Sequence, residues 1–106
     1  MSDHRLGPED AGRTVEVAAG DRVDVALPEI AGTGYTWEVE ALPPGGRVVD
    51  ERYEHAAGTG IGGGSLHLLA IDPGEGGTLR LRHGQPWMGE TGVLERFEVT
   101  LRVSGA

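Results

Sequence analysis

Apolar and polar residues alternate along most of this chain in short segments. Strict alternation is typical of half-buried β-strands, because successive side chains of a strand point to opposite faces. In the last such segment, Phe97, Val99 and Leu101 fall on one face, and Glu98 and Thr100 fall on the other. The pattern predicts about seven strands, at residues 14–18, 22–27, 35–41, 48–53, 66–71, 78–83 and 97–103.

Turn-forming residues separate these segments, and none has a sustained helical period. Pro28 is expected to end the second strand, because proline cannot donate to a central ladder. The charges of 48–53 favour an edge strand, whereas the apolar run 66–71 favours a central one. Short strands with regularly spaced turns predict an all-β fold, an immunoglobulin-like antiparallel β-sandwich of Greek-key type.

The chain has 106 residues, which fits one domain. Residues 1–13 are polar and rich in turn formers, so we expect a flexible N-terminal arm, followed by a single sandwich over 14–106. No apolar run follows Met1, so we expect no secretory signal or membrane span and a cytoplasmic location. The absence of cysteine excludes disulfides and thiolate metal sites.

Nine basic and seventeen acidic residues give a net charge of −8. This charge argues against binding to nucleic acid or to an anionic membrane, both of which need basic surface. It favours solubility and a partner with a basic or neutral face. We expect the protein to be a monomer.

The residues that could carry catalysis form no convincing set. His4, His55, His67 and His83 lack metal-ligand spacing, and the last two are predicted on the polar faces of strands. The carboxylates are expected on solvated strand exteriors, and no serine has the context of a nucleophile elbow. Gly60–Gly64 lacks the helix and lysine of a phosphate-binding loop. We therefore expect a binding protein rather than an enzyme, with no cofactor or metal.

The first of three unusual loops covers residues 28–34. Gly32 and Gly34 flank Thr33, and glycine permits positive φ and close approach by another backbone. The following strand contains Trp37, which is expected to bury a large apolar area and fix the base of the loop.

Two later loops are equally distinctive. The loop 56–65 contains five glycines, so we expect it to be mobile or ordered by a partner. The loop 84–92 places Trp87 between Pro86 and Met88. Such a tryptophan is either folded back over the sandwich or exposed as a binding residue of the type that dominates interfaces. Loops at one end of a rigid sandwich can form a joint binding edge, as antibody loops do.

Three motifs occur in these loops, in one order along residues 14–103: Gly32-Thr33-Gly34-Tyr35-Thr36-Trp37, Gly60-Ile61-Gly62-Gly63 and Gln85-Pro86-Trp87. They resemble, in the same order, three motifs of the chagasin-type inhibitors of papain-like cysteine proteases (inhibitor family I42). The family's versions are Asn-Pro-Thr-Thr-Gly-aromatic-x-Trp, Gly-x-Gly-Gly and Arg-Pro-Trp.

The resemblance implies a reversible competitive inhibitor that inserts three loops as a wedge into the active-site cleft of a papain-like (clan CA, C1) cysteine protease. It implies that the loop at Thr33 covers the catalytic cysteine and histidine, with the other two loops on either side. The protease-binding residues it implies are Gly32, Thr33, Gly34, Tyr35, Gly60, Ile61, Gly62, Gly63, Gln85, Pro86 and Trp87.

This chain departs from the family pattern at Ile30, Ala31 and Gln85. These departures keep open an alternative, in which a non-inhibitory immunoglobulin-like interaction module has retained the sandwich and lost protease binding. An enzymatic function ranks third, because no nucleophile, base or metal set can be assembled.

Overall fold

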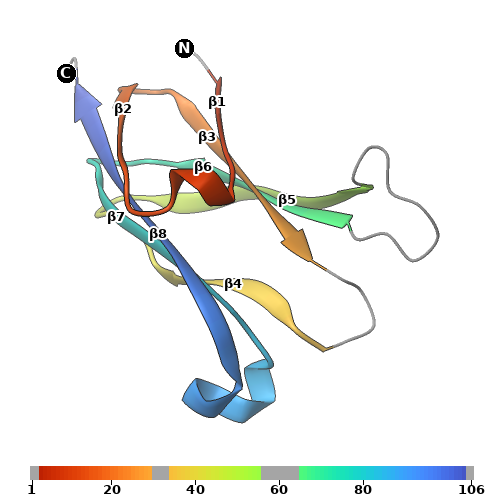
Figure 1. Ribbon diagram of the computed structural model, residues 1–106. Coiled ribbons are helices and arrows are strands. Elements are labelled where there is room, and N and C mark those ends of the chain that lie inside the picture. The colour runs from red at the N-terminus through yellow and green to blue at the C-terminus, as the bar shows by residue number, and fades with distance from the viewer. Residues whose placement is uncertain (1–2, 30–33, 56–64, 105–106) are drawn as a thin grey trace.

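The computed structural model describes residues 3–29, 34–55 and 65–104, in which two four-stranded sheets pack face to face (Figure 1). In chain order, the elements are β1 (Asp3–Leu6), η1 (Pro8–Asp10), β2 (Thr14–Ala18), β3 (Arg22–Glu29), β4 (Thr36–Ala41), β5 (Arg47–His55), β6 (Ser65–Asp72), β7 (Gly77–Gly84), η2 (Pro86–Gly92) and β8 (Val93–Ser104). The two η elements are 3₁₀ helices. No helix in the described ranges is long and apolar enough to cross a membrane.

One sheet has the strand order β1-β3-β6-β5, and the other has the order β2-β8-β7-β4. This arrangement is that of the immunoglobulin sandwich, so the predicted fold class is confirmed. As predicted, β5 lies at an edge of its sheet and β6 in the interior. Two edge pairs, β1 with β3 and β2 with β8, are parallel rather than antiparallel. Alternation could not reveal this, because a strand shows the same side-chain period in either kind of ladder.

The prediction of a flexible arm over 1–13 is wrong for residues 3–10. β1 pairs with β3, and Leu6 is buried in the core with 5% of its surface exposed. The imidazole Nε2 of His4 lies 2.8 Å from Oδ2 of Asp21, which ties β1 to the turn before β3. A four-residue strand with one buried apolar side chain has too few positions to show an alternating pattern.

The prediction that Pro28 ends a strand is also wrong, because β3 continues to Glu29. Pro28 lies opposite Leu66 of β6. β1 stops opposite Val25, so in the described part of the chain β3 has a strand neighbour on only one side at Pro28. Proline is tolerated in such an edge situation.

The core lies between the sheets and consists of the inward apolar side chains of both. Burial of each large apolar side chain contributes roughly 1.5–3 kcal/mol. The alternation of the last strand is confirmed, since Phe97, Val99 and Leu101 are each at most 2% exposed. The buried cluster comprises Leu6, Val17, Val23, Val25, Leu27, Trp37, Leu69, Ile71, Leu79, Leu81, Phe97, Val99 and Leu101.

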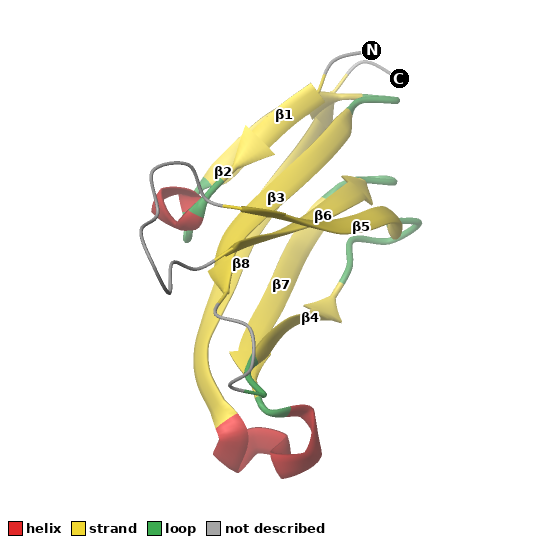
Figure 2. Ribbon diagram, turned by 90° about the vertical axis from the view of Figure 1, so that its right-hand side faces the viewer, coloured by secondary structure: helices red, strands yellow, loops and turns green. Residues whose placement is uncertain are grey.

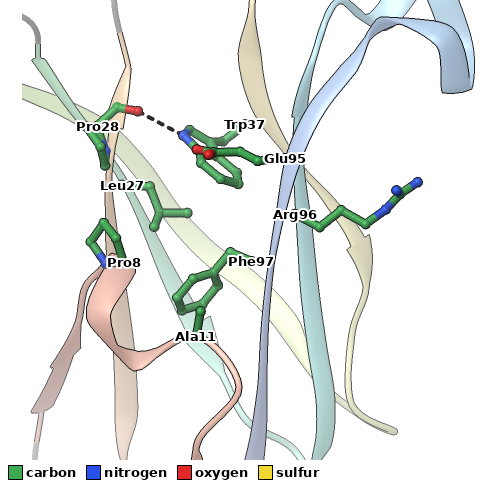
Figure 3. A pocket seen from close by; sticks show the side chains of 8 residues that line it. All are labelled: Pro8, Ala11, Leu27, Pro28, Trp37, Glu95, Arg96 and Phe97. Atoms are coloured by element: carbon green, nitrogen blue, oxygen red, sulfur yellow. Dashed lines mark hydrogen bonds between the residues drawn. The ribbon is translucent and has the colours of Figure 1, made fainter.

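The sheets part on one flank, between β3 and β8, where an open cavity of about 410 Å³ lies (Figure 3). The indole Nε1–H of Trp37 donates to the carbonyl oxygen of Pro28 at 2.9 Å and joins the two sheets beside this cavity. The side chain of Arg96 points away from it. The residues that line it are Pro8, Ala11, Leu27, Pro28, Trp37, Glu95, Arg96 and Phe97.

Replacing Leu6 by Ala tests whether β1 belongs to the fold. We expect the free energy of unfolding, measured with urea, to fall by about 2 kcal/mol or more, because a buried leucine is truncated. Leu94→Ala is the matched control: Leu94 is 61% exposed, so its truncation should change stability by less than about 0.5 kcal/mol. Equal, small effects of both substitutions would mean that β1 does not contribute to the core.

Candidate functional site

The predicted loops are attached to one end of the sandwich. In one sheet Glu29 lies opposite Ser65, and Ser65 lies opposite His55, so β3, β5 and β6 reach the same end. In the other sheet Thr36 pairs with Gly84, immediately before η2. The hydroxyl of Thr36 donates a hydrogen bond to Oε1 of Glu29, which places these two ends together. Figure 2 shows η2 projecting at this end, far from the start of β1 and the end of β8.

Part of the predicted site lies outside the described residues, namely Gly32 and Thr33 of the first motif and Gly60, Ile61, Gly62 and Gly63 of the second. The roles implied for these residues stay predictions, as does the mobility expected of the loop 56–65. The structure describes the remaining five predicted residues: Gly34, Tyr35, Gln85, Pro86 and Trp87.

Trp87 lies against Gly34 while most of its side chain remains exposed. The indole carbon Cη2 is 2.6 Å from the position that a Cβ atom on residue 34 would occupy. Gly34 also has φ +82°, in the left-handed region that favours glycine. The backbone conformation therefore favours glycine here, and a Cβ atom at this position would displace the indole of Trp87. Of the two interpretations of Trp87, the structure supports exposure, because 69% of the residue is accessible, and its role in binding stays a prediction.

The third predicted loop is more regular than expected. Pro86–Gly92 forms 3₁₀ turns, which break at Gly89, where φ is +59°. The amide of Met88 donates to the carbonyl of Gln85 at 2.9 Å, and the amide of Gln85 donates to the carbonyl of Gly92 at 3.1 Å. Proline and glycine hid this order from sequence analysis, although proline fits the first turn of a helix because that position needs no amide donor.

Arg96 of β8 holds η2 in place. Its Nη2 lies 2.8 Å from Oε2 of Glu90 in η2, and its Nε lies 2.9 Å from Oε1 of Glu40 in β4. These carboxylates, Glu40 first, raise the pKa of Arg96, whose hydrogen bond lowers the pKa of Glu40. All three side chains reach solvent, so salt screens the attraction, and the contribution of the cluster is to orient η2.

The two aromatic residues of the first motif contact His83 of β7. Trp37 is 4% exposed and stacks on His83, with ring centroids 4.7 Å apart and an interplanar angle of 10°. Tyr35 meets the same imidazole edge-on at 6.1 Å. The prediction that His83 lies on a polar face is wrong. It shares the inward face of Leu79 and Leu81, which the period of two along β7 could have indicated.

His67 was likewise predicted on a polar face, and this is also wrong. His67 lies on the inward face of β6 together with Leu69, and only 1% of its surface is exposed. Its Nδ1 lies 3.0 Å from Oε1 of Glu29, and its Nε2 lies 2.5 Å from Oε2 of Glu51. The ring of Tyr53 stacks on it at a centroid distance of 4.4 Å. Each ring nitrogen of His67 therefore lies within hydrogen-bonding distance of a carboxylate oxygen.

Glu29 is buried, with 7% of its surface exposed, which corrects the expectation that the carboxylates lie on solvated exteriors. Its Oε1 accepts hydrogen bonds from the amide of Trp37 at 2.9 Å and from the hydroxyl of Thr36 at 3.0 Å. The same oxygen also makes the hydrogen bond with Nδ1 of His67. Burial raises the pKa of Glu29, but these hydrogen bonds outweigh it, so the net pKa is lowered.

We call this set, Glu29, His67, Glu51, Thr36 and Trp37, the Glu29 network. Sequence analysis missed it because the second strand was ended at Pro28. If the predicted strand 22–27 is continued by two residues, its period of two places Glu29 on the inward face, as it does Leu27. Among the described residues, no group of three or more His, Cys, Asp or Glu side chains is arranged to hold a metal ion.

Comparison with known proteins assigns the chain to a family. The family model of the chagasin family peptidase inhibitors (I42) matches residues 16–101. The chain belongs to this family. It is 27% identical over 112 residues to chagasin from Trypanosoma cruzi, an alignment that covers 95% of this chain and 98% of chagasin. Its relatives are peptidase inhibitors and not enzymes, in agreement with the prediction.

Solved structures share the fold. The cysteine protease inhibitor EhICP2 from Entamoeba histolytica superposes with a TM-score of 0.84 at 18% identity, over 98% of this chain and 97% of EhICP2. PbICP-C, solved in complex with falcipain-2, gives a TM-score of 0.55 at 15% identity, over 98% of this chain and 100% of PbICP-C. At these identities the likeness supports the sandwich, and the arrangement of the site in this chain comes from its own contacts.

The stability contributed by Glu29 should depend on pH. Its folded-state pKa lies below its ordinary value of 4.5, so the carboxylate stabilises the fold above that value, and the contribution is lost as the pH falls through the folded-state pKa. Glu29→Gln should lower the free energy of unfolding near neutral pH by about 1–3 kcal/mol. Urea unfolding of both proteins across the acid range measures the difference. If the difference in free energy of unfolding between the two proteins stays constant or widens as the pH falls, Glu29 does not stabilise the fold as an ionised, hydrogen-bonded carboxylate.

Proposed function

We propose that this protein is a reversible competitive inhibitor of papain-like (clan CA, C1) cysteine proteases, which it blocks with one end of its sandwich. The observation that carries the proposal is the contact of the exposed Trp87 with Gly34. This contact joins residues of the first and third motifs into one surface on a rigid scaffold. Membership of the chagasin family supports the same activity.

Inhibition of this kind requires no chemistry on the part of the inhibitor. The loop at Thr33 would cover the catalytic cysteine and histidine of the protease, with Gly60–Gly63 on one side and Trp87 on the other. Gly32 and Gly34 would let the backbone pass close to the nucleophile without presenting a cleavable bond in reactive geometry. The protease would therefore not cleave the bound inhibitor.

The third loop offers an apolar contact surface. Trp87, Met88 and Leu94 are 69%, 47% and 61% exposed, and they lie in or directly after η2. Apolar area of this kind gains affinity when a protease wall covers it, and tryptophan is frequent among residues that dominate interfaces. Because Arg96 and the 3₁₀ hydrogen bonds already order η2, little conformational entropy is lost when it binds.

Two relatives support a protease as the partner. EhICP2 is described as a cysteine protease inhibitor, and PbICP-C was solved bound to falcipain-2. The net charge of −8 favours a protease with a basic or neutral face around its cleft. The cytoplasmic location and the monomeric state expected from the sequence stay predictions.

The departures at Ile30, Ala31 and Gln85 favour the second candidate, an interaction module that has lost protease binding. A titration of papain and of a cathepsin-L-like protease with the folded protein separates the two functions. Competitive, reversible inhibition that leaves the protein uncleaved supports the inhibitor. No inhibition at tens of micromolar supports the module.

Trp87→Ala should weaken inhibition of papain by about 2 kcal/mol or more, which is roughly 30-fold. Its stability should change by less than about 0.5 kcal/mol, because the removed side chain is largely exposed. Leu42→Ala is the matched control, since Leu42 is also exposed (37%) but follows β4 at the far end of the sandwich. Unchanged inhibition by the Trp87 variant would remove the assigned role of this residue.

A further inference from the structure

Glu29 occupies the point where the two sheets and the stems of two predicted binding loops meet. It is the last residue of β3, directly before the segment 30–33. Its carboxylate binds Thr36 and Trp37 at the start of β4, which is the other stem of the same loop. Because β3 and β4 belong to different sheets, these two hydrogen bonds close the loop and join the sheets.

The same residue also connects to the stem of the second loop. The hydroxyl of Ser65, at the start of β6, donates to the carbonyl oxygen of Glu29 at 3.2 Å. The carboxylate of Glu29 contacts His67 two residues further along β6, and His67 in turn contacts Glu51 of the edge strand β5. Glu29 thus contacts both stems of the first loop and the strand β6 after the second loop, and it reaches β5 through His67.

These contacts are of a kind that restricts motion. A buried carboxylate costs free energy unless its oxygens are hydrogen-bonded, so displacement of either stem would leave Glu29 under-satisfied. The cost of such a displacement keeps the stems in one arrangement before a partner binds. A binding surface that is ordered in advance loses less entropy on association.

We propose that Glu29 is a positioning residue for protease binding, which holds the stems of the first and second loops in their binding-competent arrangement. Its side chain acts through Thr36, Trp37 and His67, and it need not touch the protease. This role rests on the proposed function. It predicts that the affinity for the protease depends on a side chain buried beneath the binding surface.

The test compares three variants with the parent in inhibition of papain. Glu29→Ala removes the acceptor and should raise the inhibition constant about 10-fold or more. Glu29→Gln retains an acceptor oxygen for the Trp37 amide and should recover most of this loss. Thr36→Val keeps the shape of the side chain and removes a single donor, so a smaller increase of about threefold is expected. Amide exchange of Trp37, measured by NMR, should accelerate in Glu29→Ala and much less in Glu29→Gln.

Val17→Ala controls for loss of stability alone. Val17 is 2% exposed and pairs with Val103 near the end of β8, far from η2. Its truncation should destabilise the core and leave the inhibition constant of the folded protein unchanged. An increase in this variant equal to that of Glu29→Ala would overturn the positioning role, because general destabilisation would then explain both.

The two proposals fail in different ways. If the parent does not inhibit papain or a cathepsin-L-like protease, the proposed function fails, and the positioning role fails with it. If the parent inhibits and Glu29→Ala inhibits equally well, only the positioning role fails. If Glu29→Ala does not fold, Thr36→Val decides: an unchanged inhibition constant overturns the positioning role, and an increase without loss of stability supports it.

Discussion

A buried carboxylate joins the two sheets at the end of the sandwich where the binding loops attach. Glu29 has almost no contact with water, and three donors from β4 and β6 meet one of its oxygens. A charge in this position would destabilise the fold if any partner moved away. The strands that carry the loops are therefore coupled to one another by the cost of leaving Glu29 unpaired. The flat stacking of Trp37 on His83 reinforces the same end.

At the same end of the sandwich, large apolar side chains remain exposed instead of packing in the core. Trp87 rests on Gly34 by one edge of its indole, and η2 is fixed by its own hydrogen bonds and by Arg96. An exposed tryptophan on a rigid support is suited to a partner that covers it. The excess of acidic residues favours solubility despite these exposed apolar side chains. Rigidity below and apolar exposure above suit an inhibitor that works by fit rather than by reaction.

The strands with the strongest patterns were predicted well. The alternation of 97–103 and the apolar run 66–71 correspond to β8 and β6, and the charges of 48–53 correspond to the edge strand β5. β1 was missed because four residues with one buried side chain carry too little pattern. The continuation of β3 through Pro28 was missed because the end of β1, which leaves that part of the strand without a neighbour on one side, is visible only in three dimensions.

By itself, the sequence determined the all-β sandwich and the family, because strand periodicity and the order of three loop motifs are written in neighbouring residues. Tertiary structure alone decided what surrounds each polar side chain. The period of two could have placed His83 and Glu29 on the inward faces of their strands, but the partners of His67, His83 and Glu29 come from strands distant in the chain. The contact of Trp87 with Gly34 has the same origin, since residues fifty-three positions apart meet only when both sheets end at the same place.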